Sequence, residues 1–432
     1  MTNEITTRKL MPFQELGIQF LSHNLTCILG DEMGLGKTVQ ALGLVNNCPH
    51  IRRVLIVCPA SLKGNWVNEI KGWIDRLFKI EVLSGGTNKP ITGNMVVVNY
   101  DILQQRLSDL LSPTDSRGKR WDLVIFDEAH YLKNTSTART KAAATLIRYT
   151  HRLVFMTGTP VVNRPAELFF MLRACSPEWG NQRDFERKYC NARMKPIFWG
   201  SKKLRWDNTG VSNQKELHDK LQGFMLRRTK KEVLKDLPDK IHQIIELNVP
   251  EQYKALKDSS DKWWITLDKL PGSVTGLPAM RKECGLAKVP AAVEHIKNVL
   301  EEKQKVVIMA HHRDVVAALH TALGKYGPVM LTGDTAVSHR AEIVKKFQTD
   351  QNIRVFIGNI QAAGVGITLT ASDIVIFVEL DWVPGNMQQA EDRCHRIGQK
   401  SNVLVQYLVA PGVDAAIGRA LAAKIEVIKE VL

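Results

Sequence analysis

The sequence has no hydrophobic run long enough to cross a membrane. The apolar runs at 54–57 and 374–378 are short, whereas a membrane-spanning helix needs about 20 apolar residues. The N-terminal residues carry charges at Glu4, Arg8 and Lys9 and lack the apolar core of a signal peptide. We therefore expect an intracellular protein, cytoplasmic if its source is a bacterium or phage and nuclear if it is eukaryotic.

Cysteine pairs with metal-binding or redox spacing are also missing. The seven cysteines are scattered and include no Cys-x-x-Cys pair, which predicts reduced core thiols rather than disulfides or structural zinc. His311 and His312 are adjacent rather than at helical ligand spacing, so this pair does not indicate a metal site.

Acidic residues are scarce relative to basic ones. Lysine and arginine number 59 against 44 for aspartate and glutamate, which gives a net charge of +15. On a folded enzyme this excess favours a polyanionic partner, nucleic acid before an acidic membrane surface. A generally basic soluble protein is the alternative.

Ten short apolar runs alternate with stretches that are compatible with helices. They lie at 26–29, 54–57, 95–98, 123–126 and 153–156, and again at 306–309, 329–331, 353–357, 374–378 and 403–408. This alternation predicts two α/β lobes, each a mostly parallel sheet flanked by helices, with function at the carboxyl ends of the strands.

The region between these two sets of strands sets the expected domain boundaries. Residues 165–290 break the alternation and are basic, aromatic and compatible with helices. We expect a first lobe at 1–235 with an insertion at about 165–225, a crossover with a helical insertion at 236–290, and a second lobe at 291–432. The apolar spacing of 413–432 predicts a closing brace helix.

A glycine-rich stretch follows the first predicted strand and precedes a predicted helix. Gly34 and Gly36 let backbone N–H groups converge on phosphate oxygens. Lys37 can reach the β- and γ-phosphates, and the Thr38 hydroxyl can ligate Mg²⁺. Strict P-loop spacing would place glycine where this chain has Asp31, so an ordinary glycine-rich turn is the alternative.

An acidic pair, Asp127 and Glu128, directly follows the fourth predicted strand. We assign Asp127 to Mg²⁺ and Glu128 to the attacking water, because a carboxylate at a strand end facing a P-loop can hold the ion. A helix cap is the alternative for such a pair taken alone. After the fifth strand, the hydroxyls of Thr157 and Thr159 could sense the γ-phosphate, or form an ordinary Ser/Thr turn.

Two arginines near the end of the chain, Arg393 and Arg396, are three residues apart. On a helix they would share one face and could neutralise charge that develops on a transferred phosphoryl group. The alternative is a solvated basic face paired with Glu391 and Asp392.

These motifs, in this order, resemble those of the Swi/Snf-type DNA-dependent ATPases of helicase superfamily two. The resemblance covers nearly the whole chain and includes DEMGLGKT at 31–38, DEAH at 127–130 and QAEDRCHRIGQ at 389–399, with further stretches at 10–14, 58–62, 157–160 and 226–228. Stretches at 163–168, 187–190, 310–312 and 379–385 resemble the annealing-helicase, fork-remodelling branch.

The resemblance implies two RecA-like lobes that hydrolyse ATP with Mg²⁺ and track along double-stranded or branched DNA. It implies ATP-binding residues Gln14, which would contact adenine, Asp31, Glu32, Met33, Gly34, Leu35, Gly36, Lys37, Thr38, Gly364 and Gly366. The implied catalytic residues are Lys37, Asp127, Glu128, Arg393 and Arg396, with Arg396 as arginine finger. Coupling residues would be His130, Thr157, Thr159 and Gln389. Thr368 departs from the family, in which many members carry asparagine there.

DNA contacts are implied in both lobes. In the first lobe they fall at Ser61, Asn99, Tyr100, Arg227 and Arg228, and in the second at His311, His312, Arg313, Gly333 and Asp334. The segment 185–206 interleaves basic and aromatic residues, which can grip phosphates and stack on bases, or pack onto the first lobe with its lysines solvated. Trp263 and Trp264 are expected in the core of an insertion.

We expect a monomer that tracks along duplex DNA and has no membrane partner. The sequence also leaves three alternative functions. Asp-Glu-Ala-His also occurs in RNA helicases, so a strand-separating DNA or RNA helicase is one. An enzyme that anneals forks or bubbles is another. A nucleotide-gated DNA-binding scaffold that no longer hydrolyses ATP is the third.

Overall fold

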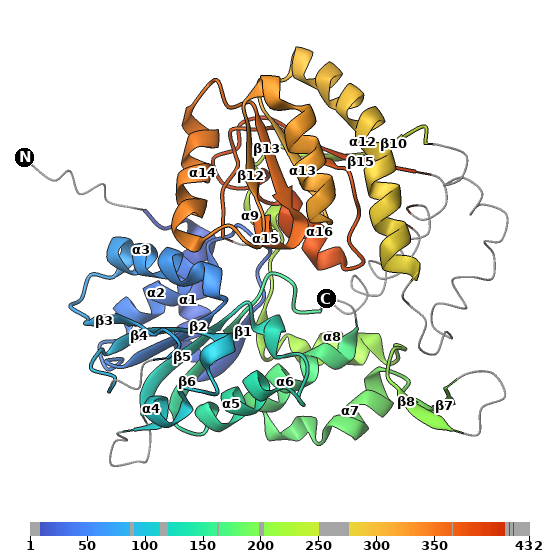
Figure 1. Ribbon diagram of the computed structural model, residues 1–432. Coiled ribbons are helices and arrows are strands. Elements are labelled where there is room, and N and C mark those ends of the chain that lie inside the picture. Colours follow the sequence, from blue (N-terminus) through green and yellow to red (C-terminus); the bar gives the residue numbers. More distant parts are fainter. Residues whose placement is uncertain are drawn as a thin grey trace, which may run out of the picture. The chain divides into compact units, whose positions relative to one another are not determined.

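The computed structural model describes residues 9–86, 90–112, 120–161, 164–197, 203–249, 276–364 and 366–410, with Asp414 and Gly418. The described chain forms two bodies. Lobe 1 contains the residues up to Asn191 together with Thr209–Lys235, and lobe 2 contains Ala192–Asn208 and the residues from Asp236 onward. Each is an α/β body built on its own sheet (Figure 1).

Lobe 1 is built on a seven-stranded sheet in the order β3-β4-β2-β5-β6-β1-β9, in which all neighbouring strands are parallel. The strands are β1 (Thr26–Leu29), β2 (Val54–Cys58), β3 (Ile80–Val82), β4 (Met95–Asn99), β5 (Trp121–Asp127), β6 (Thr150–Met156) and β9 (Met225–Leu226). All five strands predicted for this lobe are present. β2 and β4 are buried along their whole length, as expected for strands covered on both faces.

Helices provide that cover (Figure 1). They are α1 (Pro12–His23), α2 (Lys37–Asn47), α3 (Lys63–Trp73), α4 (Leu107–Leu111) and α5 (Ala138–Ile147). Short 3₁₀ turns follow several strands, namely η1 (Ala60–Leu62), η2 (Tyr100–Ile102) and η3 (Ala129–Leu132).

A helical extension completes lobe 1. It contains η4 (Pro165–Leu168), α6 (Phe169–Cys175), η5 (Pro177–Trp179), α7 (Gln182–Tyr189), α8 (Gln214–Leu221) and α9 (Lys230–Val233). Phe185 and Tyr189 of α7 are buried, with ring centroids 5.0 Å apart, and both pack against Trp179. For these two aromatics the structure therefore supports the packing alternative, and base stacking by them is ruled out as long as they stay buried.

Lobe 2 is built on a six-stranded parallel sheet in the order β10-β15-β14-β11-β13-β12. Its strands are β10 (Lys240–Glu246), β11 (Val306–Ala310), β12 (Pro328–Leu331), β13 (Val355–Asn359), β14 (Ile374–Phe377) and β15 (Val403–Val409). Its helices are α12 (Gly276–Glu302), α13 (Arg313–Ala322), α14 (Val337–Thr349), α15 (Ile360–Ala363) and α16 (Pro384–Glu391), with a 3₁₀ turn η7 (Gly324–Tyr326).

Two separate hydrophobic clusters lie on the two faces of this sheet. Val307 and Met309 of β11 belong to one cluster, and Val306 and Ile308 belong to the other. Successive residues of a strand point to opposite faces, so both faces are covered. The five strands predicted here are all present, and the predicted fold of two parallel α/β lobes is confirmed.

The region 165–290, expected to be helical, contains strands as well. β10 lies inside the predicted crossover and forms an edge of the lobe 2 sheet, while β9 extends the sheet of lobe 1. In β10, Ile241, Ile244 and Ile245 are mixed irregularly with polar residues, and most positions of this edge strand are exposed. The strand therefore lacks the apolar run or the regular alternation that signals a strand. Trp263, Trp264 and most of 413–432 lie outside the described residues.

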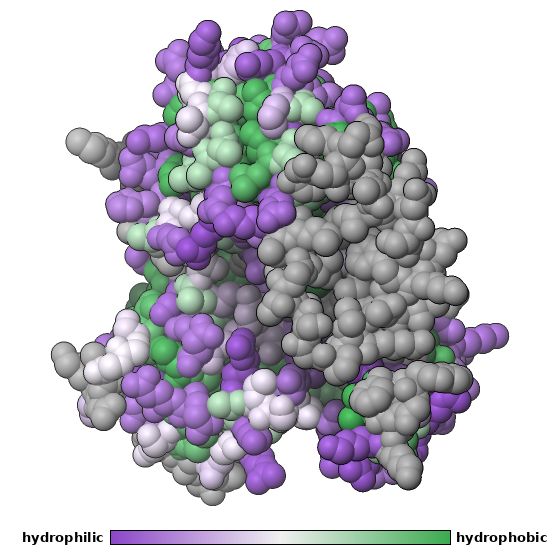
Figure 2. Space-filling view, turned by 45° about the vertical axis from the view of Figure 1, so that its right-hand side comes forward, coloured by the Kyte–Doolittle hydropathy of each residue, from purple (hydrophilic) through white to green (hydrophobic). Residues whose placement is uncertain are grey.

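A two-stranded antiparallel hairpin, β7 (Arg193–Pro196) and β8 (Leu204–Asp207), is also part of the second body. Its strands are largely exposed. In the surface view, hydrophilic residues surround smaller patches of hydrophobic ones (Figure 2).

All seven cysteines are free thiols, as predicted, and six are buried. Among the described residues no helix is long and apolar enough to span a membrane. In the same part of the chain no three His, Cys, Asp or Glu side chains are grouped to hold a metal ion.

A buried ion pair ties α12 of lobe 2 to the residues that follow β15. Lys288 Nζ lies 2.6 Å from Asp414 Oδ2 and donates to Leu408 O at 3.2 Å, and the two side chains are 1% and 7% exposed. Asp414 also accepts a hydrogen bond from Ala410 N. The pair therefore joins α12 to the chain after β15 through a buried contact.

Lys288→Met should lower the free energy of unfolding by about 3 kcal/mol, because it leaves a buried carboxylate without its cation. Urea denaturation followed by circular dichroism measures the effect. The control is Lys346→Met, since the Lys346–Glu342 pair is exposed and should leave the midpoint almost unchanged. Equal shifts in the two variants would contradict the prediction.

Candidate active site

The glycine-rich loop of lobe 1 joins β1 to α2 and has the backbone that a phosphate site requires. Gly34 and Gly36 have φ angles of +85° and +74°, in the left-handed region that glycine adopts without strain. A Cβ added to Gly36 would lie 2.4 Å from Gln14 Nε2, so a larger residue here would also displace the end of the Gln14 side chain. Lys37 and Thr38 follow in the first turn of α2.

Lys37 is directed back onto this loop. Its Nζ donates to Asp31 O at 2.8 Å and to Glu32 O at 3.3 Å. Burial lowers the pKa of Lys37, and the negative charges of Glu128, Asp31 and Asp127 oppose that shift. The ammonium group is therefore held among oxygen atoms, where an incoming phosphate could replace the backbone carbonyls.

Asp31 anchors the loop through an ion pair that bridges distant parts of lobe 1. Its side chain is fully buried, and it accepts from Arg228 through two bonds, Nε–Oδ1 at 3.0 Å and Nη2–Oδ2 at 2.5 Å. Gln40 Nε2 donates to the same carboxylate at 3.0 Å. Arg228 also donates to Phe13 O. The residue that breaks the generic P-loop spacing is thus the charge that fixes this loop.

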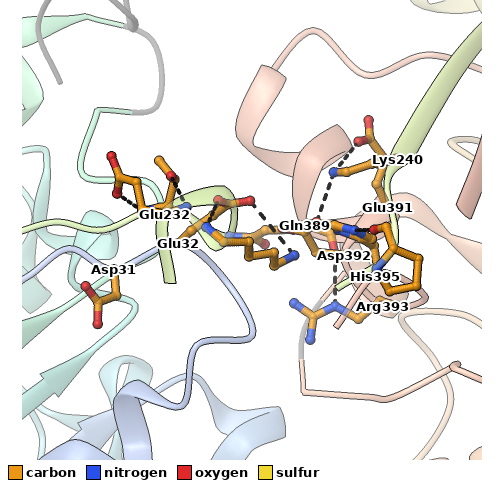
Figure 3. A network of polar contacts seen from close by, with 12 residues as sticks. Asp31, Glu32, Glu232, Lys240, Gln389, Glu391, Asp392, Arg393 and His395 are labelled. Atoms are coloured by element: carbon orange, nitrogen blue, oxygen red, sulfur yellow. Dashed lines mark hydrogen bonds and ion pairs between the residues drawn. The ribbon is translucent and has the colours of Figure 1, made fainter. Parts of the chain in front are cut away.

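The neighbouring residues strengthen the same junction. Glu32 Oε2 accepts from Lys230 N at 2.7 Å (Figure 3), and Arg227 Nη1 donates to Gly30 O at 3.0 Å. Met33 and Leu35 are buried. Together with Arg228, the segment 227–230 thus contacts three successive residues of the loop.

Gln14 lies directly beside the loop. Its side chain is buried, its Oε1 accepts from Met11 N at 3.0 Å, and its Nε2 donates to Leu35 O at 3.3 Å. The structure thus brings Gln14 to the glycine-rich loop, and its contact with adenine stays a prediction.

The acidic pair stands at the end of β5, as predicted. Trp66 Nε1 donates to Asp127 Oδ2 at 2.8 Å, and Glu128 N donates to Asp127 Oδ1 at 3.0 Å. Burial and the charge of Glu128 raise the pKa of Asp127 to about 7. The Tyr100 hydroxyl donates to Asp127 O at 2.7 Å. Trp66 is a supporting residue that no sequence motif had marked.

Glu128 has a strained backbone, since its φ of +50° lies in the left-handed region, which costs a non-glycine residue about 1–3 kcal/mol. His130 Nδ1 lies 3.3 Å from Glu128 Oε2 and 3.2 Å from Thr157 Oγ1. His130 therefore connects the acidic pair to the turn after β6. That is the arrangement expected of the coupling residues His130 and Thr157, whose role itself stays a prediction.

The turn after β6 packs directly on the glycine-rich loop. A Cβ built on Gly158 would lie 2.4 Å from Met33 Cγ and 3.3 Å from Lys37 Nζ. Thr159 N donates to Thr157 Oγ1 at 3.1 Å, which is an ordinary Ser/Thr turn. Thr159 Oγ1 is buried without a hydrogen-bond partner among the described residues. The Thr157 hydroxyl thus forms the turn, and the Thr159 hydroxyl takes no part in it.

The residues predicted to contact DNA in lobe 1 mostly have structural partners. Tyr100 is 2% exposed and stacks on Tyr131 with ring centroids 5.3 Å apart. Asn99 is buried and accepts from Lys63 Nζ at 3.1 Å. Arg227 and Arg228 hold the glycine-rich loop, as described above. Ser61 lies in η1 after β2. The geometry gives the buried ones a supporting role, and their contact with DNA stays a prediction.

In lobe 2 the stretch 389–399, called the arginine motif below, does not carry its two arginines on a helix as expected. α16 ends at Glu391, and Arg393 and Arg396 lie in the turns beyond it. They converge nonetheless, because Arg393 Nη1 and Arg396 Nη1 both donate to Ile367 O, at 3.3 and 3.1 Å. A shared acceptor in the preceding loop, rather than helical spacing, brings the guanidinium groups together.

The loop that accepts these arginines contains the predicted glycines. Gly366 has a φ of +75°, and a Cβ on Gly364 would lie 2.7 Å from Ile360 O. Thr368 Oγ1 accepts from Arg396 Nη1 at 3.0 Å, which gives the residue that departs from the family a specific contact. Gln389 is buried, and its carbonyl accepts from Arg393 Nε at 2.9 Å (Figure 3).

The lobe 2 residues predicted to contact DNA gather at the carboxyl ends of β11 and β12. His311 N and His312 N both donate to Glu379 Oε2, at 2.9 and 2.8 Å. Arg313 and Asp334 form an exposed ion pair. A Cβ on Gly333 would lie 3.6 Å from Arg313 Nη2. The grouping fits the expectation, and the DNA contact stays a prediction.

Arg228→Met should destabilise lobe 1 by about 3 kcal/mol, because it leaves the buried Asp31 carboxylate unpaired. The double variant Asp31→Asn/Arg228→Met removes both charges and should be more stable than the single variant. Thermal and urea unfolding compare the two. A double variant that is less stable than the single one would show that the ion pair does not anchor the loop.

Comparison with known proteins places this chain in a family. The family model described as SNF2-related domain matches residues 13–267, and the helicase conserved C-terminal domain matches residues 290–398. The human protein named DNA annealing helicase and endonuclease ZRANB3 is 37% identical over 419 residues, covering 94% of this chain and 38% of that protein.

Other relatives match over a similar part of the chain. The Caenorhabditis elegans homologue of SWI/SNF-related matrix-associated actin-dependent regulator of chromatin subfamily A-like protein 1 is 34% identical, covering 93% of this chain and 59% of that protein. A solved Sulfolobus solfataricus SWI2/SNF2 ATPase core in complex with dsDNA is 25% identical with a TM-score of 0.47, covering all of this chain and 94% of that one.

The chain thus spans between 38% and 59% of the length of the two curated relatives named here. The SNF2-related domain alone accounts for more than half of its 432 residues. The chain belongs to the SNF2 family.

Proposed function

We propose that this protein hydrolyses ATP with Mg²⁺ and uses the reaction to translocate on double-stranded DNA, remodelling DNA or protein–DNA structures. The observation that carries the proposal is the gathering, within lobe 1, of Lys37, the acidic pair and the Thr157 turn around one glycine-rich loop. Lobe 2 presents a convergent arginine pair. These are the parts that phosphoryl transfer needs, a phosphate cradle, carboxylates and guanidinium groups.

The residues of lobe 1 fit ATP with Mg²⁺. Asp127 offers carboxylate oxygens at a strand end, and Thr38 offers a hydroxyl in the first turn of α2, which are the hard oxygen ligands that Mg²⁺ prefers. When bound, the ion would neutralise phosphate charge. Glu128 would orient the attacking water, and Lys37 would exchange its backbone acceptors for phosphate oxygens.

The arginine pair of lobe 2 would act on the transferred phosphoryl group. Guanidinium groups neutralise the charge that develops on the transferred phosphoryl group. Since Arg393 and Arg396 belong to a different lobe from Lys37, we propose that hydrolysis requires lobe closure and that DNA favours the closed state.

DNA is proposed as the partner on two grounds. The net charge of +15 suits a polyanion, and the human relative is named as a DNA annealing helicase. We propose a monomer organised as residues 1–235, 236–290 and 291–432, working where the cell keeps its DNA. Fork remodelling or strand annealing is the finer form of the proposal.

The β7–β8 hairpin favours that finer form. Its cross-strand pairs place Arg193, Lys195 and Arg205 on one face, with Asp207 paired to Lys195. Met194, which is 50% exposed, and Leu204, which is 52% exposed, lie on the other. A cationic face backed by an exposed apolar face suits the phosphates and exposed bases of a branch.

Glu128→Gln and Lys37→Ala should abolish turnover. Arg396→Ala should lower kcat by roughly a thousandfold or more while nucleotide still binds, because a finger acts on the transition state. Steady-state phosphate release measures turnover in each variant, and a nucleotide-binding assay on the purified protein measures whether nucleotide still binds. Near wild-type hydrolysis by Arg396→Ala would remove the finger assignment, and a wild-type protein with no phosphate release would favour the scaffold.

Duplex DNA should stimulate hydrolysis, and branched DNA should stimulate it more. RNA as the only activator would overturn the proposal in favour of an RNA helicase, and strand displacement without annealing would favour a separating DNA helicase. Stimulation should fall steeply with salt, because phosphate contacts release counterions.

Arg193→Gln/Arg205→Gln should remove the advantage of branched over plain duplex DNA. It should also lower the slope of log affinity against log salt by about 2 on branched DNA. The control variant is Lys325→Gln/Lys346→Gln, which removes two other exposed cations of lobe 2. Equal losses on branched and plain duplex would contradict a branch-specific role for the hairpin.

A further inference from the structure

A buried charged cluster lies next to the arginine motif of lobe 2, outside the residues that the proposed reaction uses. Lys240 Nζ lies 2.9 Å from Glu391 Oε2 and 3.0 Å from Asp392 Oδ1 (Figure 3). The three side chains are 14%, 6% and 1% exposed, respectively. One ammonium group is therefore enclosed by two carboxylates.

Glu391 is also held from the neighbouring strand. The Tyr407 hydroxyl of β15 donates to Glu391 Oε1 at 2.6 Å, and His242 Nε2 of β10 lies 3.1 Å from Glu391 Oε2. The rings of His242 and Tyr407 stack with centroids 5.9 Å apart. Burial opposes ionisation of Glu391, but Lys240 and His242 outweigh it and lower the pKa of Glu391 to about 2. The carboxylate thus stays charged and fixed.

The strand that supplies Lys240 is the first of lobe 2 after the connection from lobe 1. Lobe 2 begins again at Asp236 after the lobe 1 segment Thr209–Lys235, and β10 starts four residues later, at Lys240. Pro238 O lies 2.7 Å from His395 Nε2 (Figure 3). Three residues of this entry segment, Pro238, Lys240 and His242, therefore contact the arginine motif.

The contacts fall on the turn that presents the arginines. Glu391 is the last residue of α16, and Asp392 is its C-cap. Cys394 and His395 lie between the two arginines, and their backbone N–H groups both donate to Glu391 O, at 3.1 and 3.4 Å. The backbone of Glu391 therefore holds the turn that contains Arg393 and Arg396. Leu369 N of the preceding loop donates to Arg393 O at 2.8 Å. A shift of Glu391 or Asp392 would move both guanidinium groups.

Stability alone is a weak reason for such a cluster. Desolvation of buried charges cancels much of their attraction, so well-packed apolar residues often serve equally well. Buried ion pairs are better attested as contacts that fix how one element is aligned with another. Here the ion pairs align the turn after α16 with β10.

We propose that Lys240 is a positioning residue for the arginine motif, whose ammonium group, held between Glu391 and Asp392, sets the turn that presents Arg393 and Arg396. The proposal rests on the proposed function, in which these arginines complete the ATP site. It makes the entry strand of lobe 2 part of the catalytic geometry without any contact with nucleotide.

The test compares Lys240→Met with Lys240→Arg and Lys288→Met in DNA-stimulated ATP hydrolysis, at a temperature where all remain folded by circular dichroism. Lys240→Met should lower kcat by about tenfold to a hundredfold, because a displacement of about 1 Å can cost that much. The Kd for ATP should change much less than kcat, since the glycine-rich loop and most of the other implied ATP-binding residues are in lobe 1. Lys240→Arg keeps the cation and should restore most of kcat.

Lys288→Met is the matched control, because it removes a buried lysine from an ion pair of the same lobe that does not contact the arginine motif. Its kcat should stay within twofold of wild type. Equal losses of kcat in Lys240→Met and Lys288→Met, or a change in the Kd for ATP alone, would overturn the positioning role. If Lys240→Met does not fold, Asp392→Asn decides: a lowered kcat supports the role, and an unchanged kcat overturns it.

Arg396→Ala in the same series separates the finger role of Arg396 from the positioning role of Lys240. If Arg396→Ala hydrolyses ATP at the wild-type rate, the proposed finger fails and the positioning role fails with it. If Arg396→Ala is impaired while Lys240→Met is not, only the positioning role is overturned.

Discussion

The interaction on which the candidate site of lobe 1 depends most is the buried ion pair between Asp31 and Arg228. A phosphate-binding loop exposes backbone N–H groups and has few side chains of its own to hold it in place. In this chain the loop carries a carboxylate, and the residues after β9 carry the arginine that neutralises it. Because β9 is the outermost strand next to β1, the pair joins the edge of the sheet to the loop that β1 supplies.

The parallel sheets bring the remaining parts together. Carboxyl ends of parallel strands share one edge, so the loops after β1, β5 and β6 meet although they are far apart in sequence. His130 and Gly158 mark the contact, since one bridges Glu128 to Thr157 and the other lies against Met33 and Lys37. The same rule in lobe 2 gathers His311, Arg313 and Asp334.

Sequence reasoning located the strands and the motif loops, because buried parallel strands are short apolar runs and phosphate loops need particular residues. It missed β10, since most positions of that edge strand are exposed and its apolar pattern is irregular. It placed Arg393 and Arg396 on a helix from their spacing, whereas α16 ends at Glu391 and Ile367 O gathers them. It assigned Arg228 to DNA, a contact that stays a prediction, and did not foresee its ion pair with Asp31. Contacts between distant residues, such as Trp66 with Asp127, leave no local signal.

Both lobes use buried charge at the place where accuracy is needed. Asp31 with Arg228 fixes the loop that would hold the phosphates, and Lys240 with Glu391 and Asp392 fixes the turn that would present the arginines. Ion pairs of this kind contribute little net stability when compared with apolar packing, but their geometry is directional and a slipped register leaves a charge unpaired. A hydrophobic contact tolerates a shift of an ångström, and catalysis does not. The placement of these ion pairs in each lobe is therefore better explained by geometry than by folding energy.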